Sequence, residues 1–257
     1  IIRCFAKYFR DHEEDINTLR TLVKSAVLIA VPLAMILQQP DLKNTITIAI
    51  IFCILLYIAG LSYKIIGGAL LIVIPLAVVF LFIVVQPDQK LIKSYQRNRI
   101  MAFLNSEDDE YSDAVNQQEN SVMAIGSGQL TGKGLNNNEV ASANKGNFVS
   151  ENQTDFIFSV AGEELGFIGC VAILLLLLLI IFECIRTSLR AKDTAGKIIC
   201  CGVASIVAVQ GFINVAVVTK IMPNTGTPLP FVSYGLTSMV SLYIGMGLVL
   251  NVGLQRY

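Results

Sequence analysis

Charged residues are scarce in this sequence. They make up 15% of its 257 residues, whereas hydrophobic residues make up 54% and mean hydropathy is +0.65. A soluble globular domain carries about 25% charged residues. The composition therefore excludes a soluble domain and predicts an integral membrane protein. The formal net charge is zero, so the total charge indicates neither a nucleic acid nor an acidic partner.

Histidine is also scarce, and this limits the chemistry that the chain can perform. The sequence contains only His12, which lies in a basic segment near the start. No Ser-His-Asp triad, Cys-His pair or multi-histidine metal site can be assembled from it. A reaction on the outer face of the membrane must use carboxylates, lysine, arginine and hydroxyl groups.

The cysteines lack the spacing of a metal site or of a disulfide framework. There is no C-x-x-C pair, and five of the six cysteines lie in or beside apolar runs. They are Cys4, Cys53, Cys170, Cys184, Cys200 and Cys201. We interpret them as buried thiols that pack as small hydrophobic side chains.

Six apolar runs are long enough to cross a bilayer, because about 20 helical residues span the hydrocarbon. They predict an all-α polytopic helix bundle that forms a single membrane domain over residues 1–257. No signal sequence precedes the first residue, and we expect residues 1–20 to be the end of a preceding helix and a cytoplasmic loop of a longer protein. The predicted spans are approximately 21–38, 45–63, 65–85, 156–185, 198–222 and 231–252.

The basic residues predict the orientation of the spans. They gather before the first span and between the fourth and fifth, which lie on one side of the membrane if the spans alternate. These residues are Arg3, Lys7, Arg10, Arg20, Lys24, Arg186, Arg190, Lys192 and Lys197. The positive-inside rule places them in the cytoplasm. The C-terminus is then cytoplasmic, and residues 86–155 form a large extracellular loop.

Asp155 lies where this loop meets the fourth span. An acid at the mouth of a membrane segment is costly and indicates a function, although Asp155 or Thr154 can also act as a helix cap. On a helix, Glu163 lies roughly 80° round from Asp155 and Glu164 roughly 180°. We therefore expect Glu163 to share a cavity with Asp155, and Glu164 to find another partner.

A glycine-rich segment at residues 126–134 contains Lys133. It fails the Walker pattern, because Ser127 replaces the first glycine and Gly134 replaces the final Ser or Thr. Nucleotide binding is therefore rejected. Two interpretations stay open, namely a flexible turn and a backbone nest that holds a diphosphate with Lys133.

Two other connections on the predicted outer side carry candidate residues. Asp41 follows the first span, where it either caps the next helix or lines the same cavity as Asp155. Ser233 and Tyr234 open the last span after a proline-rich connection. Their hydroxyl groups need hydrogen-bond partners at membrane depth, and a ligand can supply them.

Together these segments resemble the SEDS family (shape, elongation, division and sporulation), which includes FtsW, RodA and SpoVE. The matches follow the family order over almost the whole chain. They are QPDL at 39–42, RI with FLN at 99–105, AIGSG at 124–128, GKGL at 132–135, TDFIFSVAGEELGFIG at 154–169 and LPFVSYG at 229–235. The sequence departs from the family pattern at Lys43, Ser150, Gln153 and Leu236, among other positions.

The resemblance implies the last six spans of a ten-helix fold and an inverting peptidoglycan glycosyltransferase. Such an enzyme polymerises lipid II, an undecaprenyl-diphosphate disaccharide pentapeptide, on the outer face of the bacterial cytoplasmic membrane. It implies that Asp155 is catalytic, as the general base. The expected substrate-binding residues are Asp41, Arg99, Lys133, Glu163, Ser233 and Tyr234.

The same resemblance implies the partners. They are lipid II, a class B penicillin-binding protein that supplies the transpeptidase, and membrane lipids, with no nucleic acid. The diphosphate leaving group suggests a divalent cation, Mg²⁺ or Mn²⁺, but no ligand spacing identifies its site. A lipid II flippase, which suits broken helices and acids within the membrane, and a non-enzymatic scaffold that recruits a cell-wall synthase are the alternatives.

Overall fold

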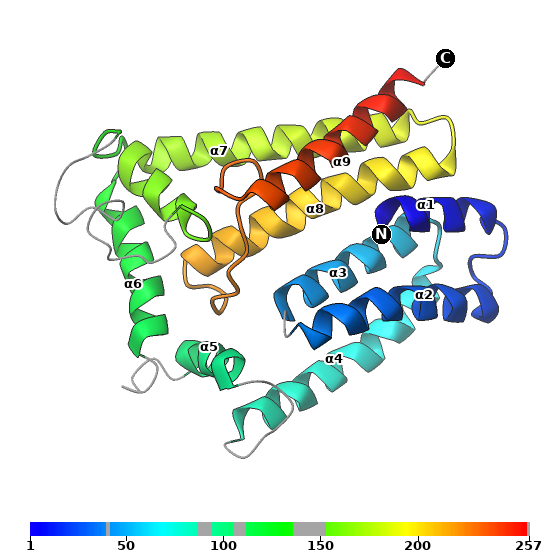
Figure 1. Cartoon of the computed structure of the whole chain (residues 1–257), viewed down its shortest axis with the longest axis horizontal. Coiled ribbons are helices and arrows are strands. Elements are labelled where there is room, and N and C mark those ends of the chain that lie inside the picture. The colour runs from blue at the N-terminus through cyan, green and yellow to red at the C-terminus, as the bar shows by residue number, and fades with distance from the viewer. Residues whose placement is uncertain (40–41, 87–93, 105–111, 136–152, 256–257) are drawn as a thin grey trace. The chain divides into compact units, whose positions relative to one another are not determined.

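The computed structural model describes residues 1–39, 42–86, 94–104, 112–135 and 153–255, and the regular elements in these ranges are all helices (Figure 1). The predicted all-α class is confirmed. The helices are α1 (Ile2–Asp11), α2 (Leu19–Gln38), α3 (Leu42–Ile58), α4 (Tyr63–Val85), α5 (Ser94–Leu104), α6 (Ser112–Ser127), α7 (Ile157–Leu189), α8 (Thr194–Val218) and α9 (Leu236–Leu254).

Four of the described helices are long and apolar enough to cross a membrane. These are α2, α7, α8 and α9, whose most apolar windows have mean hydropathies of 1.9, 3.2, 2.1 and 1.5. The apolar helix α3 is shorter, and α4 lies over the third predicted span. Pro32 lies inside α2 and Pro75 inside α4, as a membrane helix allows when other groups bond to the freed carbonyls.

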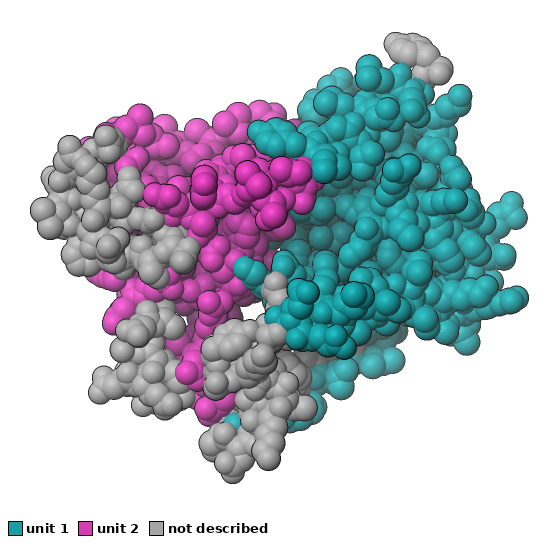
Figure 2. Space-filling model, in the orientation of Figure 1, with its two compact units in different colours: residues 1–86, 180–209, 242–257 teal, residues 87–179, 210–241 magenta. Residues whose placement is uncertain are grey.

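The contacts within the chain form two compact units, drawn in different colours in Figure 2. Unit 1 comprises residues 1–86, 180–209 and 242–257, and unit 2 comprises residues 87–179 and 210–241. The sequence led us to expect one membrane domain. Helices α7, α8 and α9 each contribute residues to both units.

The core of unit 1 forms around the aromatic face of α1. The Phe5 ring lies 5.0 Å from the Phe52 ring of α3, centroid to centroid, and both side chains are buried. Leu55 of α3 and Ile198 of α8 are fully buried in the same cluster. A Cβ added to Gly202 of α8 would lie only 2.8 Å from a side-chain atom of Ile2. The small residue therefore allows close contact with α1.

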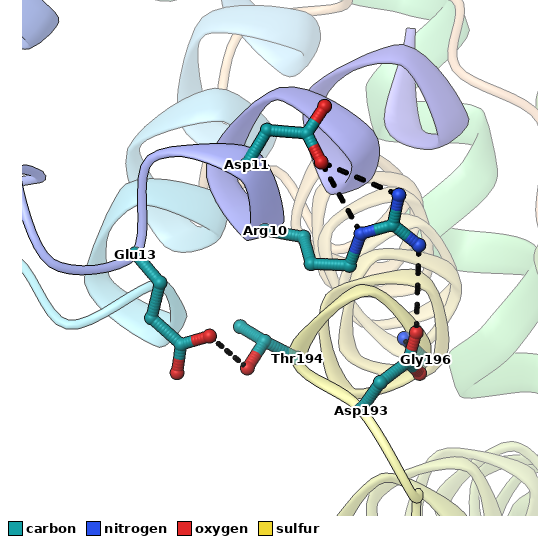
Figure 3. Close-up of polar contacts among 6 residues, drawn as sticks. All are labelled: Arg10, Asp11, Glu13, Asp193, Thr194 and Gly196. Atoms are coloured by element: carbon teal, nitrogen blue, oxygen red, sulfur yellow. Dashed lines mark hydrogen bonds and ion pairs between the residues drawn. The ribbon is translucent and has the colours of Figure 1, made fainter.

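Polar contacts join the end of α1 to the start of α8 in unit 1 (Figure 3). Arg10 Nη1 lies 3.9 Å from Asp193 Oδ2, and Thr194 Oγ1 donates to Glu13 Oε2 at 2.8 Å. Asp193 Oδ1 also accepts from the Gly196 N–H at 2.9 Å, which caps α8. About half of each side chain in the Arg10–Asp193 pair is exposed, and such pairs contribute roughly 0–1 kcal/mol.

In unit 2, the region predicted as a large loop contains α5 and α6. Helix α6 caps the C-terminal end of α8. Gln118 Nε2 donates to the Val217 and Met222 carbonyls at 2.8 and 2.9 Å, and Ser121 Oγ donates to the Val218 carbonyl at 3.0 Å. The last carbonyls of a helix have no partner within the helix. Part of the polar character of α6 therefore serves this cap.

Candidate functional site

Asp155 lies in a turn of residues 153–156 that leads into α7. Phe156, which is 1% exposed, anchors the turn, and its carbonyl accepts from Ser159 Oγ at 2.7 Å. The Asp155 residue itself is partly exposed. Because α7 begins at Ile157, the residue directly before the helix is Phe156.

Three consecutive carbonyl groups of this turn each accept a hydrogen bond from a residue much later in the chain. The donors are Tyr234 N to the Gln153 carbonyl at 2.9 Å, Ser233 Oγ to the Thr154 carbonyl at 2.5 Å, and Asn214 Nδ2 to the Asp155 carbonyl at 2.7 Å. All these residues belong to unit 2. The turn that presents Asp155 is thus held along its backbone.

Two of the donors also fix the connection between α8 and α9. Ser233 Oγ accepts from the Leu229 N–H at 2.7 Å, and Asn214 Nδ2 donates to the Thr227 carbonyl at 2.7 Å. Ser233 is 4% exposed and Asn214 is 0% exposed. The Ser233 hydroxyl, for which the sequence allowed a ligand as partner, joins two backbone segments. The Tyr234 side chain is 78% exposed.

Glu163 forms an ion pair with Lys133. Lys133 Nζ lies 3.1 Å from Glu163 Oε1, and the two side chains are 28% and 2% exposed. We expected Glu163 to share a cavity with Asp155. The ion pair connects Glu163 to the glycine-rich turn, where its carboxylate has a cationic partner. Such a partner is needed when a charge is buried.

The glycine-rich turn fits into a break in α7. Gly166 has non-helical torsion angles, φ 67° and ψ −167°, and the helix changes direction there (Figure 1). Backbone N–H groups of the turn bond to the carbonyls before the break, and carbonyls of the turn bond to the N–H groups after it. These bonds run from Lys133 N to Glu163 O (2.9 Å), Gly134 N to Glu164 O (3.0 Å), Phe167 N to Gln129 O (2.9 Å) and Ile168 N to Leu130 O (3.2 Å). The turn therefore satisfies groups that a broken helix leaves free.

Three glycines allow this approach of backbone to backbone. A Cβ at Gly128 would overlap the Gly162 carbonyl, one at Gly132 would overlap the Glu164 carbonyl, and one at Gly166 would overlap the Gly132 nitrogen. Gly132 and Gly166 also have positive φ, at 80° and 67°, which favours glycine. The segment is therefore a turn of defined structure. The backbone N–H groups of Lys133 and Gly134 already donate to carbonyls of α7, so they are not available to bind a diphosphate.

The family follows from a comparison with known proteins. The model of the family described as "Cell cycle protein", which covers FtsW, RodA and SpoVE, matches residues 1–257. The chain belongs to this family. The resemblance to SEDS proteins is confirmed, and with its apolar helices the chain is a multi-pass membrane protein.

Curated relatives carry names from this family. The chain is 34% identical over 226 residues to the probable peptidoglycan glycosyltransferase FtsW of Geobacter metallireducens, covering 88% of the chain and 56% of that protein. It is 34% identical over 230 residues to the peptidoglycan glycosyltransferase MrdB of Escherichia coli, covering 90% of the chain and 59% of that protein. The chain therefore spans less than two thirds of the length of these relatives.

Two solved structures share the fold. One, from work on the "Structural coordination of polymerization and crosslinking by a peptidoglycan synthase complex", has a TM-score of 0.73 at 24% identity, over 94% of this chain and 64% of that one. The other is a point mutant of the Rod shape determining protein RodA of Thermus thermophilus, with a TM-score of 0.60 at 21% identity, over 98% and 64%. At these identities the likeness shows the fold alone.

Two further residues were predicted for the site, Arg99 and Asp41. Arg99 is exposed on α5. Asp41 lies outside the described residues. In the ranges that the structure describes, no group of three or more His, Cys, Asp or Glu side chains could hold a metal ion.

Sequence reasoning missed Asn214, which holds the Asp155 carbonyl. The signal was present, because an amide side chain inside an apolar span is unusual and tends to bond to other elements of the bundle. Gln118 and Ser121 of α6 were missed for a different reason. Their i,i+3 spacing places them on one helix face, but the acids and amides around them in the sequence are typical of a solvated loop.

Proposed function

We propose that this protein is a peptidoglycan glycosyltransferase that polymerises lipid II on the outer face of the bacterial cytoplasmic membrane. The names of the relatives from Geobacter metallireducens and Escherichia coli support this activity. The observation that carries the proposal is that Asp155 is a partly exposed residue on a turn in which the carbonyls of residues 153–155 are fixed by hydrogen bonds. A held carboxylate is what general base catalysis requires.

In the proposed reaction, Asp155 accepts the proton of the hydroxyl group on the acceptor sugar. The hydroxyl oxygen forms a bond to the anomeric carbon of the donor sugar, and the bond from that carbon to the diphosphate oxygen breaks. The diphosphate oxygen keeps the electron pair of the broken bond, and the diphosphate departs while it is still attached to the undecaprenyl lipid. A single displacement inverts an α-linked donor to a β-linked product, as in inverting glycosidases.

The departing diphosphate needs positive charge nearby. We assign this role to Arg99, which is exposed, and to Lys133, which keeps 28% of its side chain accessible while it pairs with Glu163. Asp41 and Tyr234 complete the proposed substrate contacts. For Glu163 and Ser233, the contacts in the structure support a role in holding the walls of the site.

A divalent cation, Mg²⁺ or Mn²⁺, is part of the proposal as an ion that accompanies the diphosphate. Such ions bind through one or two carboxylates together with substrate phosphates, and the described residues contain no larger cluster of acids that would retain an ion by itself. The proton transfer and displacement described above depend only on residues of the chain.

The proposed partner is a class B penicillin-binding protein, which would crosslink the new glycan strands. A peptidoglycan synthase complex is among the structures that share this fold, and that supports the proposal. We also propose a cytoplasmic C-terminus, because the connection between α7 and α8 carries Arg190 and Lys192, and Lys197 lies in the first turn of α8.

The deciding experiment uses the full-length protein, purified with its partner and supplied with lipid II in liposomes. Glycan strands longer than a disaccharide are the expected product, measured by gel separation of labelled chains. A flippase would move lipid II across the bilayer without forming strands. A scaffold would neither form strands nor move lipid II by itself. Strands would then form only when a separate synthase is added.

A further inference from the structure

We infer that Asn214 is a positioning residue that fixes the backbone at Asp155 and thereby sets the direction of its carboxylate. The inference rests on the proposed function of Asp155 as the general base. Asn214 belongs to α8, and 59 residues separate it from Asp155 in the sequence. No contact of Asn214 with substrate is involved.

The Asn214 amide nitrogen has two hydrogen atoms to donate, and main-chain oxygens accept both. Asn214 Nδ2 lies 2.7 Å from the Asp155 carbonyl oxygen and 2.7 Å from the Thr227 carbonyl oxygen. The side chain is 0% exposed. One amide group on a rigid helix thus ties the turn before α7 to the connection after α8.

The other polar atom of this side chain, Oδ1, is buried without a hydrogen-bond partner in the part of the chain that the structure describes. An unsatisfied buried acceptor costs free energy. An apolar side chain of similar size would avoid that cost in a membrane helix, but it would leave the Asp155 and Thr227 carbonyls without their donor. The two donated bonds are therefore what the asparagine provides.

The geometry around the Asp155 Cα atom shows why these bonds matter. Ser233 holds the carbonyl of the peptide group before Cα, and Asn214 holds the carbonyl of the peptide group after it. When both peptide groups are fixed, the Cα–Cβ bond has a fixed direction. A catalytic group must be held within about 0.5 Å of its productive position, and a displacement of about 1 Å can reduce the rate about 100-fold.

The test measures lipid II polymerisation by the full-length protein with its partner. Asn214→Leu removes both donors at similar volume, and Asn214→Asp replaces the donor nitrogen with an oxygen of the same size. We expect kcat to fall about 100-fold, while KM for lipid II stays within about threefold because the substrate-binding groups are unchanged. Gln210→Leu is the matched control for Asn214→Leu, since Gln210 lies one turn earlier on α8 and has a buried, unpartnered Oε1 among the described residues. It should retain kcat.

Thermal unfolding in detergent accompanies each assay. A folded Asn214 variant with kcat within about threefold of the parent overturns the inference, and so does a loss of activity that only matches the loss of folded protein. If neither variant folds, Asn214 is a folding residue and the inference is wrong. Asp155→Asn is measured alongside. If that variant polymerises lipid II, the proposed function itself fails, whereas an inactive Asp155→Asn with an active Asn214→Leu refutes only the positioning role.

Discussion

Lys133 and Glu163 are joined twice, once through their side chains and once through their backbones. Lys133 Nζ lies 3.1 Å from Glu163 Oε1, and the Lys133 N–H donates to the Glu163 carbonyl at 2.9 Å. The ion pair therefore lies directly beside the hydrogen bonds that fit the glycine-rich turn into the break of α7. This relationship links the charge of the pair to the geometry of the helix break.

Replacing Lys133 and replacing Glu163 should lower the stability of the protein by different amounts. Lys133→Met leaves a carboxylate that is 2% exposed without its cation, whereas Glu163→Gln leaves a lysine that is 28% exposed and can reach solvent. We expect Lys133→Met to cost about 3–5 kcal/mol, the range for removing one partner of a buried ion pair, and Glu163→Gln to cost clearly less. Thermal unfolding in detergent measures both. Equal losses, or a larger loss for Glu163→Gln, would contradict this asymmetry.

Alanine at the interlocking glycines should disrupt the turn. Gly132→Ala and Gly166→Ala each place a methyl group on neighbouring backbone at a positive φ, so we expect loss of folded protein or cleavage of the turn by protease. Gly126→Ala is the matched control in the same segment, because a Cβ there meets nothing within 4 Å. It should be tolerated, with a helix-propensity gain of up to about 1 kcal/mol. Equal tolerance of alanine at all three positions would refute the close fit of the glycine-rich turn into the break in α7.

Asp155→Asn should abolish polymerisation while the fold survives. Asparagine keeps the size and most of the hydrogen bonding but cannot accept a proton at neutral pH, so we expect the rate to fall by roughly two to four orders of magnitude. If Asp155 serves only as a cap, asparagine replaces it with a stability change of at most about 1 kcal/mol. Strand formation from lipid II and thermal unfolding are measured on the same sample. Near-normal strand formation by the Asp155→Asn protein would rule out Asp155 as the general base.

The topology can be tested by labelling single cysteines with a membrane-impermeant reagent in intact cells. In a cysteine-free background, Asn116→Cys on α6 should react, because the charge pattern places residues 86–155 outside. Arg190→Cys, at the end of α7, should react only after the cells are opened. Both native residues are exposed, so access within the protein does not differ between them. Labelling at position 190 in intact cells would reverse the proposed orientation.

The sequence by itself determined the helical class and the places of the apolar helices. Run length and composition are local properties, and a bilayer forces each long apolar segment to satisfy its backbone within a helix. Local pattern also singled out Asp155 and the glycine-rich segment. The order of the motifs was enough to indicate the family, which the match over residues 1–257 confirms.

Only the tertiary structure decided which groups those residues contact. The Lys133–Glu163 pair joins residues 30 apart, Asn214 reaches Asp155 across 59 residues, and Ser233 reaches Thr154 across 79. Periodicity carries no information over such separations, because the partners depend on how helices pack and where α7 breaks. For the same reason, the glycine spacing indicated a turn but not the helix break that the turn fills, and the polar pattern of α6 did not reveal the carbonyls that it caps.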